Sequence, residues 1–442
     1  MSVRFEIAHR SATSHARVGV VHTPHGSFQT PAFMPVGTRG TVRGLLPGLV
    51  RATGAEIILG NTYHLLLRPG PETVRRLGGL QRFSGWGGPM LTDSGGYQAY
   101  SMAGINRITE QGVTFKSIVD GREIELTPER AMVVQHQLGA DIIMAFDDCP
   151  PSVDPEAGPV NQTRLKLAAE RDAAAAARGG ASSRGRLKGA YDHPGRLKLA
   201  NERTVRWLER CKAEHERLGG DDACALFGIV QGGTDTEQRT WSAERICNID
   251  LPGYAIGGVA VGEQSGDIAR VVRHTAPLLP DAKPRYLMGV GYERDLLAAV
   301  MAGVDMFDCV LPTRNGRNAS AFTRMGQIRL RNAQYAEDPL PIEVGCDCVA
   351  CGESGLGSGR AAESHFSRAY IRHLFLAGEM LGPILVSLHN LRHFQRFMVD
   401  LRATVCIDGW DGFLTRWPAV SPTFADVAPG RAAGADGDLQ AG

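Results

Sequence analysis

Two carboxylates interrupt an otherwise apolar segment in the last third of the chain. Asp305 and Asp308 lie in the run from Val304 to Leu311, which Pro312 ends. An ionised carboxylate is costly to bury unless it is paired or used, so this segment is a candidate for chemistry. The residues that follow, 313–317, are rich in arginine and predict a flexible cationic loop after a buried strand. A carboxylate beside such a loop suggests chemistry on a phosphate-bearing substrate.

The two carboxylates are predicted to have different roles. Side chains alternate between the two faces of a strand, so residues three positions apart point to opposite sides. Asp308 is therefore the candidate for chemistry, and Asp305 is expected to have a structural partner.

A second group of residues has the spacing of a metal site. Cys346, Cys348 and Cys351 lie close together in the sequence. Three thiolates and one imidazole satisfy the tetrahedral geometry of a closed, structural zinc site. Spacing alone leaves the fourth ligand open among His365, His373, His389 and His393. Such a site would close a small appendage that could not build a sufficient core of its own.

Polar and glycine residues also follow several apolar runs that are typical of strands. These residues are Asp93, Ser94, Gly95, Gly96, Tyr97, Asp147, Gln231, Gly257 and Gly258. Tyr97 could stack on an aromatic base. Taken singly, each has a simpler interpretation: Asp93 caps a tight turn, Asp147 lies in a solvated acidic loop, and the glycines relieve packing. Their convergence with Asp308 on one rim is not expected of a purely structural barrel.

The types of residue present restrict the chemistry. The chain has several such carboxylates but no HExxH helix, no Walker loop and no nucleophilic serine or cysteine motif. This favours covalent or acid–base carboxylate chemistry at an electrophilic carbon, and a glycosidic C1′ with an oxocarbenium-like transition state suits it. Asp147, Gln231 and the glycine amides suit the edge of a purine. The arginines of 313–317 suit phosphates, which position a nucleic acid without reading its sequence.

These groups must be positioned by a repeated strand–helix architecture. Apolar runs alternate with helical patterns seven or eight times, which indicates a parallel sheet with right-handed crossovers. The predicted strands cover 56–59, 89–92, 141–146, 223–230, 254–256, 285–288 and 304–308. One predicted helix is capped by Thr127 and runs from Pro128 to Leu138, with Gly139 as its stop. Another runs from Asp295 to Met301.

A doubly wound sheet and a barrel both fit this alternation. Polar residues end many strands and do not gather at one switch point, which favours an α/β fold of the (β/α)8 TIM-barrel class. Residues 1–40 are predicted to form an N-terminal β segment with turns at 25–26 and 35–37. The catalytic barrel is predicted at 41–335, a zinc-binding α+β subdomain at 336–420, and a disordered tail at 421–442.

One insertion is visible inside the predicted barrel. Residues 164–200 carry the pentapeptide Arg-Leu-Lys-Leu-Ala twice, separated by an alanine run and a Gly/Ser-rich stretch. We interpret the segment as a helix interrupted by a mobile loop. The alternative is an extra RNA-contacting arm, because the segment is basic.

Composition and charge restrict the class of protein. The 442 residues are 43% hydrophobic and 21% charged, which is ordinary for a globular chain, and the net charge of +1 means that any nucleic-acid surface must be a local patch. The first residues lack the apolar region of a secretory signal, and no run approaches the ~18 apolar residues of a membrane span. We therefore expect a cytoplasmic protein whose nine cysteines are reduced, with no membrane contact.

From about residue 5 to residue 420, the chain resembles the bacterial tRNA-guanine transglycosylase family. The resemblance rests on the cysteine set and on the motifs at 93–98, 146–149, 227–232, 257–263, 286–291 and 304–318. It implies a zinc-bearing (β/α)8 barrel with glycosyltransferase activity. Such an enzyme exchanges guanine 34, at the wobble position of a tRNA anticodon, for the 7-deazaguanine preQ1. The exchange passes through a covalent enzyme–RNA intermediate and leads to queuosine.

The resemblance also implies roles for individual residues. Asp308 is the expected nucleophile, and Asp93 is the expected general acid–base and proton acceptor. The expected substrate-binding residues are Asp93, Ser94, Gly95, Gly96, Tyr97, Asp147, Gln231, Gly257, Gly258 and Met288. Tyr97 and Met288 would sandwich the heterocycle.

The same carry-over gives the RNA-binding and metal-binding residues. RNA contacts are expected at Gly289, Val290, Gly291, Tyr292, Glu293, Arg294, Asp295, Thr313, Arg314, Asn315, Gly316 and Arg317. The family pattern resolves the choice of histidine in favour of His389, which with Cys346, Cys348 and Cys351 would hold one structural Zn²⁺ per chain.

The partners that the resemblance implies are tRNA, small bases and a second copy of the chain. The tRNAs are those with a GUN anticodon, which accept aspartate, asparagine, histidine and tyrosine, and the small bases are preQ1 and guanine. Cys149 and Val261 resemble the bacterial pocket that admits preQ1, whereas Val259 stands where leucine is more usual. The interface aromatic residues of the homodimer would fall at Phe83, Phe366, Tyr370 and His373, with Phe366 in place of a tryptophan.

Two other interpretations compete with this one. A barrel N-glycosidase would hydrolyse nucleosides, but the cysteine appendage and the arginines of 313–317 argue against a small free substrate. A non-catalytic RNA-binding subunit would lack the nucleophile, and this chain has Asp308.

Overall fold

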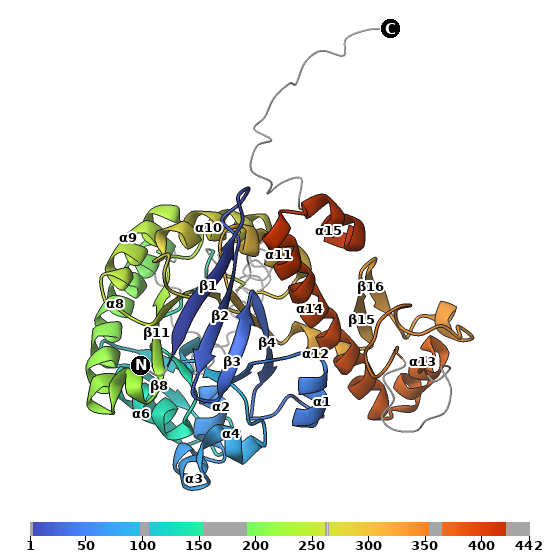
Figure 1. The fold of residues 1–442 in the computed structure, drawn as a ribbon. Coiled ribbons are helices and arrows are strands. Elements are labelled where there is room, and N and C mark those ends of the chain that lie inside the picture. Colours follow the sequence, from blue (N-terminus) through green and yellow to red (C-terminus); the bar gives the residue numbers. More distant parts are fainter. Residues whose placement is uncertain are drawn as a thin grey trace, which may run out of the picture.

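The computed structural model describes residues 3–97, 106–153, 192–260, 263, 265–352 and 365–420, and a closed barrel of parallel strands forms its centre (Figure 1). In order round the barrel, the strands are β4 (Ala32–Gly37), β5 (Ile58–Gly60), β6 (Met90–Thr92), β10 (Ile142–Met144), β11 (Ala225–Val230), β12 (Gly253–Ile256), β13 (Arg285–Leu287) and β14 (Met306–Cys309). β14 pairs with β4, with Asp308 opposite Met34, and this pairing closes the ring. The predicted (β/α)8 architecture is confirmed.

The first barrel strand lies before the predicted start of the barrel. The prediction that the barrel begins at residue 41 is wrong, because β4 begins at Ala32 and all of its residues are buried. Residues 35–37, interpreted as a turn, belong to this strand. Proline cannot donate a hydrogen bond to a sheet. Pro35 is tolerated because it stands in the last pair of the β4–β14 ladder, and the β4–β5 ladder begins only at Val36.

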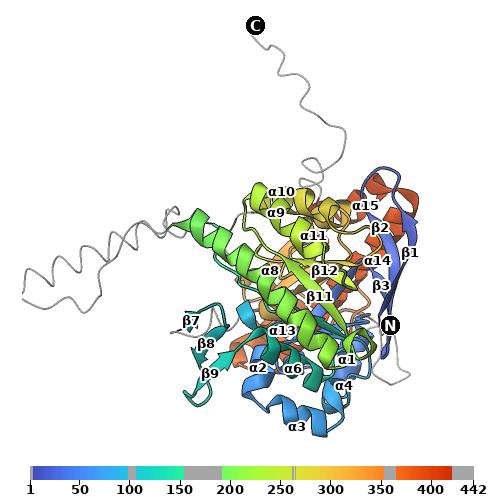
Figure 2. The ribbon, with the colours of Figure 1, turned by 90° about the vertical axis from the view of Figure 1, so that its left-hand side faces the viewer.

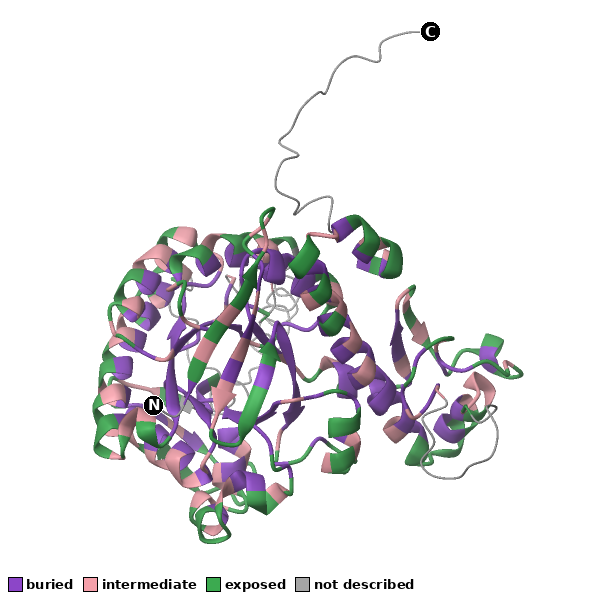
Figure 3. Cartoon of the chain, viewed as in Figure 1, coloured by how far each residue is buried: buried purple, intermediate pink, exposed green. Residues whose placement is uncertain are grey.

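A small antiparallel sheet covers one end of the barrel. It consists of β1 (Arg4–Arg10), β2 (Arg17–Thr23) and β3 (Gly26–Thr30) in the order β1-β2-β3. Val21 and Phe28 belong to the same apolar cluster as Met34 and Phe227 of the barrel strands. The backbone N–H of His25, in the β2–β3 turn, donates to the carboxylate of Asp141, immediately before β10. The sheet therefore closes the end where the barrel strands begin, and Figure 3 shows the strands behind it coloured as buried.

Helices surround the barrel. They are α1 (Pro47–Ala52), α2 (Thr62–Leu67), α3 (Pro71–Arg76), α4 (Gly79–Ser84), α6 (Pro128–Leu138), α8 (His193–Arg217), α9 (Thr236–Cys247), α10 (Ser265–Thr275) and α11 (Glu293–Met301), with the 3-10 turns η1 (Gly220–Asp222) and η2 (Ala276–Leu278). α8 packs against α6 and α9, as Figure 2 shows. A further sheet of β7 (Asn106–Ile108), β8 (Val113–Lys116) and β9 (Glu123–Leu126) precedes α6.

Two helix predictions can be compared with the structure directly. The prediction for α6 is confirmed: Thr127 Oγ1 accepts from the backbone N–H of Arg130, and Gly139 ends the helix with a φ of 76°. α11 begins at Glu293, two residues before the predicted start, with Tyr292 as its N-cap.

The segment after β14 is helical, which corrects the prediction of a flexible loop. Residues 311–317 form α12 (Leu311–Arg317), and Pro312 lies in its first turn. Proline is favourable there because the first backbone N–H groups of a helix have no intrahelical acceptor. The arginines of this segment therefore project from a short helix.

The chain then leaves the barrel and returns along one long helix. The appendage contains β15 (Ser320–Thr323), β16 (Gly326–Arg329), η3 (Ala333–Tyr335) and α13 (Arg368–Ala377), and it has its own apolar cluster. α14 (Leu381–Ile407) runs back against the barrel, followed by α15 (Trp410–Arg416) and η4 (Pro418–Val420). Phe394 of α14 stacks on Phe33 of β4 at a centroid distance of 4.8 Å, and the Gln395 side chain donates to the Phe33 carbonyl. α14 therefore completes the outer layer beside the first barrel strand (Figure 1).

Some predictions fall on residues outside this description. The tail 421–442 and most of the insertion lie there, and of the insertion only residues 192–200 are described, where α8 begins. No helix in the described part of the chain is long and apolar enough to span a membrane.

Candidate active site and metal centre

The polar residues predicted at strand ends meet at one end of the barrel. Because all strands are parallel, the residues that follow them share one rim, opposite the β1–β3 sheet. Ser94 Oγ donates to Asp147 Oδ1 at 3.2 Å, and Gln231 Nε2 donates to Asp147 Oδ2 at 2.5 Å. These contacts join the ends of β6, β10 and β11.

Asp308 is held in an asymmetric way. Tyr286 Oη and the backbone N–H of Gly289 both donate to its Oδ1, at 2.6 Å and 2.7 Å. Its Oδ2 has no hydrogen-bond partner among the described residues. Burial raises the pKa of Asp308, and the hydrogen bonds from Tyr286 and Gly289 oppose that rise by stabilising the carboxylate. The two hydrogen bonds on Oδ1 therefore fix the orientation of the carboxylate and leave Oδ2 available to a ligand.

Asp93 is held from the end of the neighbouring strand β5. The backbone N–H of Thr62 donates to Asp93 Oδ1 at 2.7 Å, and Asn61 Nδ2 donates to Oδ2. The Thr62 hydroxyl donates to the Asp93 carbonyl at 2.5 Å. The pKa of Tyr286 is raised well above 10 by burial, then by the charge and hydrogen bond of Asp308, and also by the charge of Asp93. The two carboxylates therefore act on the same buried tyrosine.

Asp147 is the buried carboxylate that Ser94 and Gln231 contact, and we call these three residues the polar floor of the rim. Burial raises the pKa of Asp147 from 3.8 to about 6, and the neighbouring Asp148 adds to the rise, while hydrogen bonds from Gln231 and Ser94 oppose it. The carboxylate is therefore ionised at neutral pH but becomes protonated in mildly acidic solution.

The neighbouring Asp148 is balanced by two arginines of α8. Arg196 and Arg203 each approach its carboxylate to 2.5 Å. Arg196 belongs to the basic pentapeptide that we considered as part of an RNA-contacting arm, and the structure directs this side chain into the protein. Sequence reasoning missed both pairs.

A buried arginine supports the glycine turn after β12. Arg239 of α9 is fully buried and donates to four backbone carbonyls, those of Val230, Gly233, Gly257 and Gly258. Burial lowers the pKa of Arg239 to about 10. Gly258 has a φ of 62°, and a side chain there would overlap the Gln231 amide. Arg239 was not predicted from the sequence. Its burial could have been predicted from its spacing, because it shares one helix face with Ala243 and Ile246 of α9.

The remaining substrate-binding residues of the prediction line the same rim. Gly95 has a φ of 77°, and a Cβ on Gly96 would lie 3.1 Å from the Asp147 carbonyl. Tyr97 is 41% exposed at the edge, and Met288 is half-buried after β13. Cys149 is buried, whereas Val261 lies outside the described residues.

Asp305 has the structural partner that alternation predicted. It is fully buried, and its two oxygens accept from Arg17 Nε at 2.9 Å and Arg17 Nη2 at 2.6 Å. The backbone N–H of Arg285 also donates to it at 2.7 Å. The pairing anchors β14 to the β1–β3 sheet.

The residues predicted to contact RNA divide by burial. Side chains of Val290, Asp295 and Thr313 are buried, Gly291 packs against Cys309, and Gly316 packs against Ser387 of α14. The accessible members are Gly289, Tyr292, Glu293, Arg294, Arg314, Asn315 and Arg317. Glu293 is already engaged, because His393 Nε2 lies 2.8 Å from its carboxylate.

Three arginines lie close together on α12 and in the loop after β4. The pKa of Arg317 is lowered by partial burial and by the positive charges of Arg43 and Arg314. Arg43 lies in the loop after β4, next to β14 in the barrel, and it was not among the predicted contacts. Its sequence neighbours, Val42 and Gly44, gave no signal of this role. The cluster makes this part of the rim suitable for anions.

The three cysteines and His389 converge on one point. Sγ of Cys346, Cys348 and Cys351 lie 3.6, 3.5 and 3.2 Å from His389 Nδ1, and all four residues are buried. His389 Nε2 lies 2.7 Å from the Phe322 carbonyl, to which it can donate, so that Nδ1 is free to ligate. The prediction of His389 as the fourth member of the cluster is confirmed, and the set fits a closed metal site.

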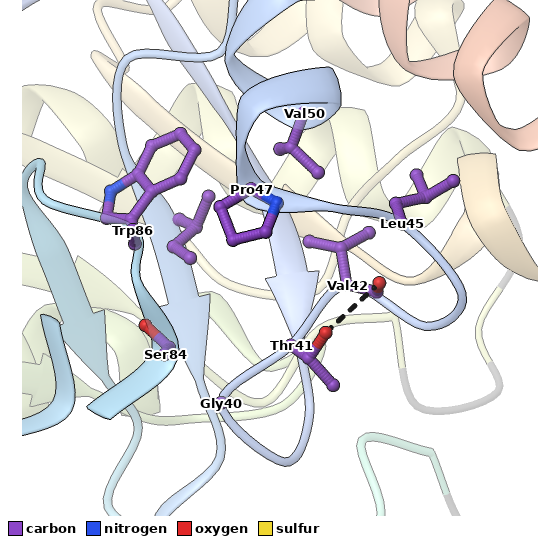
Figure 4. Close-up of a pocket in the computed structure, with 9 residues that line it drawn as sticks. Gly40, Thr41, Val42, Leu45, Pro47, Val50, Ser84 and Trp86 are labelled. Atoms are coloured by element: carbon purple, nitrogen blue, oxygen red, sulfur yellow. Dashed lines mark hydrogen bonds between the residues drawn. The ribbon is translucent and has the colours of Figure 1, made fainter. Parts of the chain in front are cut away.

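Two further features are a group of aromatic side chains and a small apolar pocket. Phe366, Tyr370 and His373 form a stack, with centroids 5.9 and 6.4 Å apart, and Phe83 is 39% exposed. A small apolar pocket lies between residues 40–50 and Trp86 (Figure 4), and none of the rim carboxylates lines it.

Comparison with known proteins gives a consistent result. A family model described as "Queuine tRNA-ribosyltransferase" matches residues 11–181 and 189–422. A protein of that name from Thermus thermophilus is 48% identical over 402 residues, covering 91% of this chain and 90% of the relative. Relatives of the same name from Symbiobacterium thermophilum and Synechococcus elongatus are 46% and 43% identical, covering 99% and 96% of this chain and 96% and 97% of their own lengths.

Proposed function

The chain belongs to the queuine tRNA-ribosyltransferase family, and we propose that its reaction is the exchange of guanine 34 of a tRNA for preQ1. Family membership makes it a tRNA-guanine transglycosylase, a glycosyltransferase-type enzyme that acts on tRNA. The finer assignments concern the position in the anticodon, the incoming base and the role of each residue.

Asp308 is the proposed nucleophile. Its Oδ2 attacks C1′ of nucleotide 34, the bond from C1′ to N9 breaks, and Asp93 supplies a proton to the departing guanine. Asp93 then takes a proton from the incoming preQ1, whose N9 attacks C1′ and releases the Asp308 carboxylate. The observation that carries this assignment is the placement of both hydrogen-bond donors on Asp308 Oδ1.

Base recognition is assigned to the polar floor of the rim. The ionised Asp147 would accept hydrogen bonds from the N–H groups of the guanine edge, which preQ1 shares. Gln231 and the backbone N–H of Gly258 would donate to the carbonyl oxygen of the base, with Tyr97 and Met288 on its two faces. The four hydrogen bonds of Arg239 support the assignment, because they fix the Gly257–Gly258 turn beside Gln231.

The tRNA backbone is assigned to the arginine cluster. Arg43, Arg314 and Arg317 lie close together, the last two on the helix that follows Asp308 in the chain, and could neutralise phosphates on either side of nucleotide 34. The proposed substrates are tRNAs with a GUN anticodon, for aspartate, asparagine, histidine and tyrosine. Because the substrate is tRNA, we also assign the enzyme to the cytoplasm.

The cysteine cluster is assigned one Zn²⁺ ion per chain. Three thiolates and one imidazole are the donor set of structural zinc sites, and all four positions are filled by protein. The ion would join the appendage to α14 and take no part in the reaction.

A homodimer is assigned to the stack of Phe366, Tyr370 and His373 together with Phe83. Tyr370 is 42% exposed, and stacked aromatic groups at a surface are typical of interfaces.

The nucleophile is tested with Asp308→Asn. The wild-type enzyme and tRNA are denatured together, and a shifted band on the gel reports the covalent complex. We expect the variant to lose this band while it still binds tRNA in a filter assay, because the arginines are intact. A shifted band with the variant would contradict the assignment.

The incoming base is tested by exchange on tRNA carrying labelled guanine 34, with preQ1, preQ0 and queuine supplied in parallel. We expect preQ1 to be incorporated best. Release of guanine without incorporation of any base would instead favour an N-glycosidase, and binding without release would favour a non-catalytic subunit.

A further inference from the structure

A second group of side chains that could hold a metal ion lies away from the rim. His136 comes from α6, His215 from α8, and Cys224 immediately precedes β11. Cys224 stands where β11 begins, and α6 ends shortly before β10 begins. The group is therefore at the end of the barrel opposite the carboxylates, and it shares no residue with the Cys346 cluster.

The three donor atoms have the separations of a metal site. His136 Nε2 lies 2.9 Å from His215 Nδ1 and 3.7 Å from Cys224 Sγ, and all three atoms lie within 4.8 Å of one another. Around a tetrahedral Zn²⁺, ordinary bond lengths place a nitrogen and a sulfur about 3.6 Å apart and two nitrogens about 3.3 Å apart. The separation of His136 Nε2 from Cys224 Sγ already matches, and the two imidazole nitrogens need to separate by only about 0.4 Å.

A carboxylate behind the cluster orients one ligand. His215 Nε2 lies 3.1 Å from Asp221 Oδ1, so its proton is held on the side away from His136 and Cys224. Histidine ligands commonly have such a carboxylate on their other nitrogen, which leaves the first nitrogen free to bind a metal. His215 and Cys224 are each 3% exposed, whereas His136 is partly exposed and gives access from solvent.

We infer that His136, His215 and Cys224 bind a second Zn²⁺ ion, independent of the catalytic rim and of the Cys346 cluster. A thiolate with two imidazoles is a soft donor set that favours zinc over magnesium or calcium. The ion would tie α6 and α8 to the start of β11, and α8 is the helix whose arginines hold Asp148.

Loading of this site exchanges protons for the metal. Burial lowers the pKa of His136 to about 4, and burial raises the pKa of Cys224 to about 12. At neutral pH His136 can therefore bind as a neutral imidazole, with its remaining proton on Nδ1. On binding the metal, the Cys224 thiol would release its proton to solvent.

The test counts zinc in the full-length protein. The chain is equilibrated with Zn²⁺ buffered at a free concentration that fills tight sites only, desalted, and measured by mass spectrometry of the metal against protein concentration. We expect two equivalents for the wild type, and one each for Cys224→Ser and His136→Gln. Cys247→Ser is the control, because Cys247 is a free, partly buried cysteine at the end of α9 that belongs to no ligand cluster in the described residues, and this variant should keep two.

Two results would overturn the inference. The first is a single equivalent in the wild type, which is independent of whether any variant folds. The second is two equivalents in both Cys224→Ser and His136→Gln. Cys348→Ser distinguishes the two sites, since it should lose one equivalent while the ion at His136, His215 and Cys224 remains.

Discussion

The unusual protonation of Asp147 makes a prediction about stability that is separate from activity. Each pKa unit corresponds to about 1.4 kcal/mol, so raising this carboxyl from 3.8 to about 6 costs the folded state about 3 kcal/mol at pH 8. Between pH 3.8 and 6, the folded chain binds more protons than the unfolded chain, so this cost grows as pH rises. It is complete above pH 6 and absent below about pH 3.8.

We therefore expect Asp147→Asn to stabilise the protein at pH 8 by up to about 3 kcal/mol, because the amide carries no charge to desolvate. Its oxygen can still accept from Gln231, and its amino group can donate to Ser94 Oγ. Urea unfolding, followed by the fluorescence of the five tryptophans, measures the difference between variant and wild type at pH 8, 7, 6 and 5. The gain should shrink steadily below pH 6, while base exchange is lost at every pH.

Asp250→Asn is the matched control, since that carboxylate is 88% exposed and its removal should change the free energy of unfolding little at any pH. A variant at Asp147 that is less stable than the wild type at pH 8, or a difference that does not change with pH, would refute the reasoning.

Three further predictions concern other parts of the molecule. Cys348→Ser should lose the zinc of the appendage and lower the melting temperature measured by calorimetry, and full occupancy by metal analysis would contradict the ligand set. Arg239→Lys keeps the positive charge but loses the guanidinium group that donates to four carbonyls. We expect the KM for preQ1 to rise and the free energy of unfolding to fall by at least about 2 kcal/mol. An unchanged KM for preQ1 would count against a positioning role for Arg239. Arg314→Ala should weaken tRNA binding and reduce the slope of log affinity against log salt by about 1, whereas Arg245→Ala, exposed on α9, should leave that slope unchanged.

The sequence was most informative where local pattern and structure depend on the same residues. Apolar runs in the sequence predicted buried strands, and Thr127 and Gly139 marked the ends of α6. The strand β4 was not predicted as part of the barrel, because proline and glycine, present at Pro35 and Gly37, are typical of turns. Only the pairing with the neighbouring strands shows that these residues are tolerated in a strand. The helix α12 was predicted as a loop for a similar reason, because a proline such as Pro312 can end a strand or begin a helix.

The parts of the site that were missed depend on contacts across long stretches of chain. An arginine that binds only backbone carbonyls, as Arg239 does, leaves no complementary residue in the sequence to pair it with. Arg17 and Asp305 are 288 positions apart, so alternation could predict that Asp305 had a partner but not which one. The position of Arg43 beside Arg314 and Arg317 could not be predicted, because it depends on the pairing of β4 with β14 that closes the barrel.

The long helix α14 has a consequence for how the protein is made. It is synthesised after every strand of the barrel, yet Phe394 and Gln395 cover Phe33 on the first strand. The same helix supplies His389 to the cysteine cluster, and Asn390, whose side chain holds the carbonyls of Pro312 and Ser320. A nascent chain therefore keeps the outer side of β4 uncovered until residues 381–407 have been synthesised. A premature stop before that point would leave Asp308 in a barrel whose first strand lacks this cover.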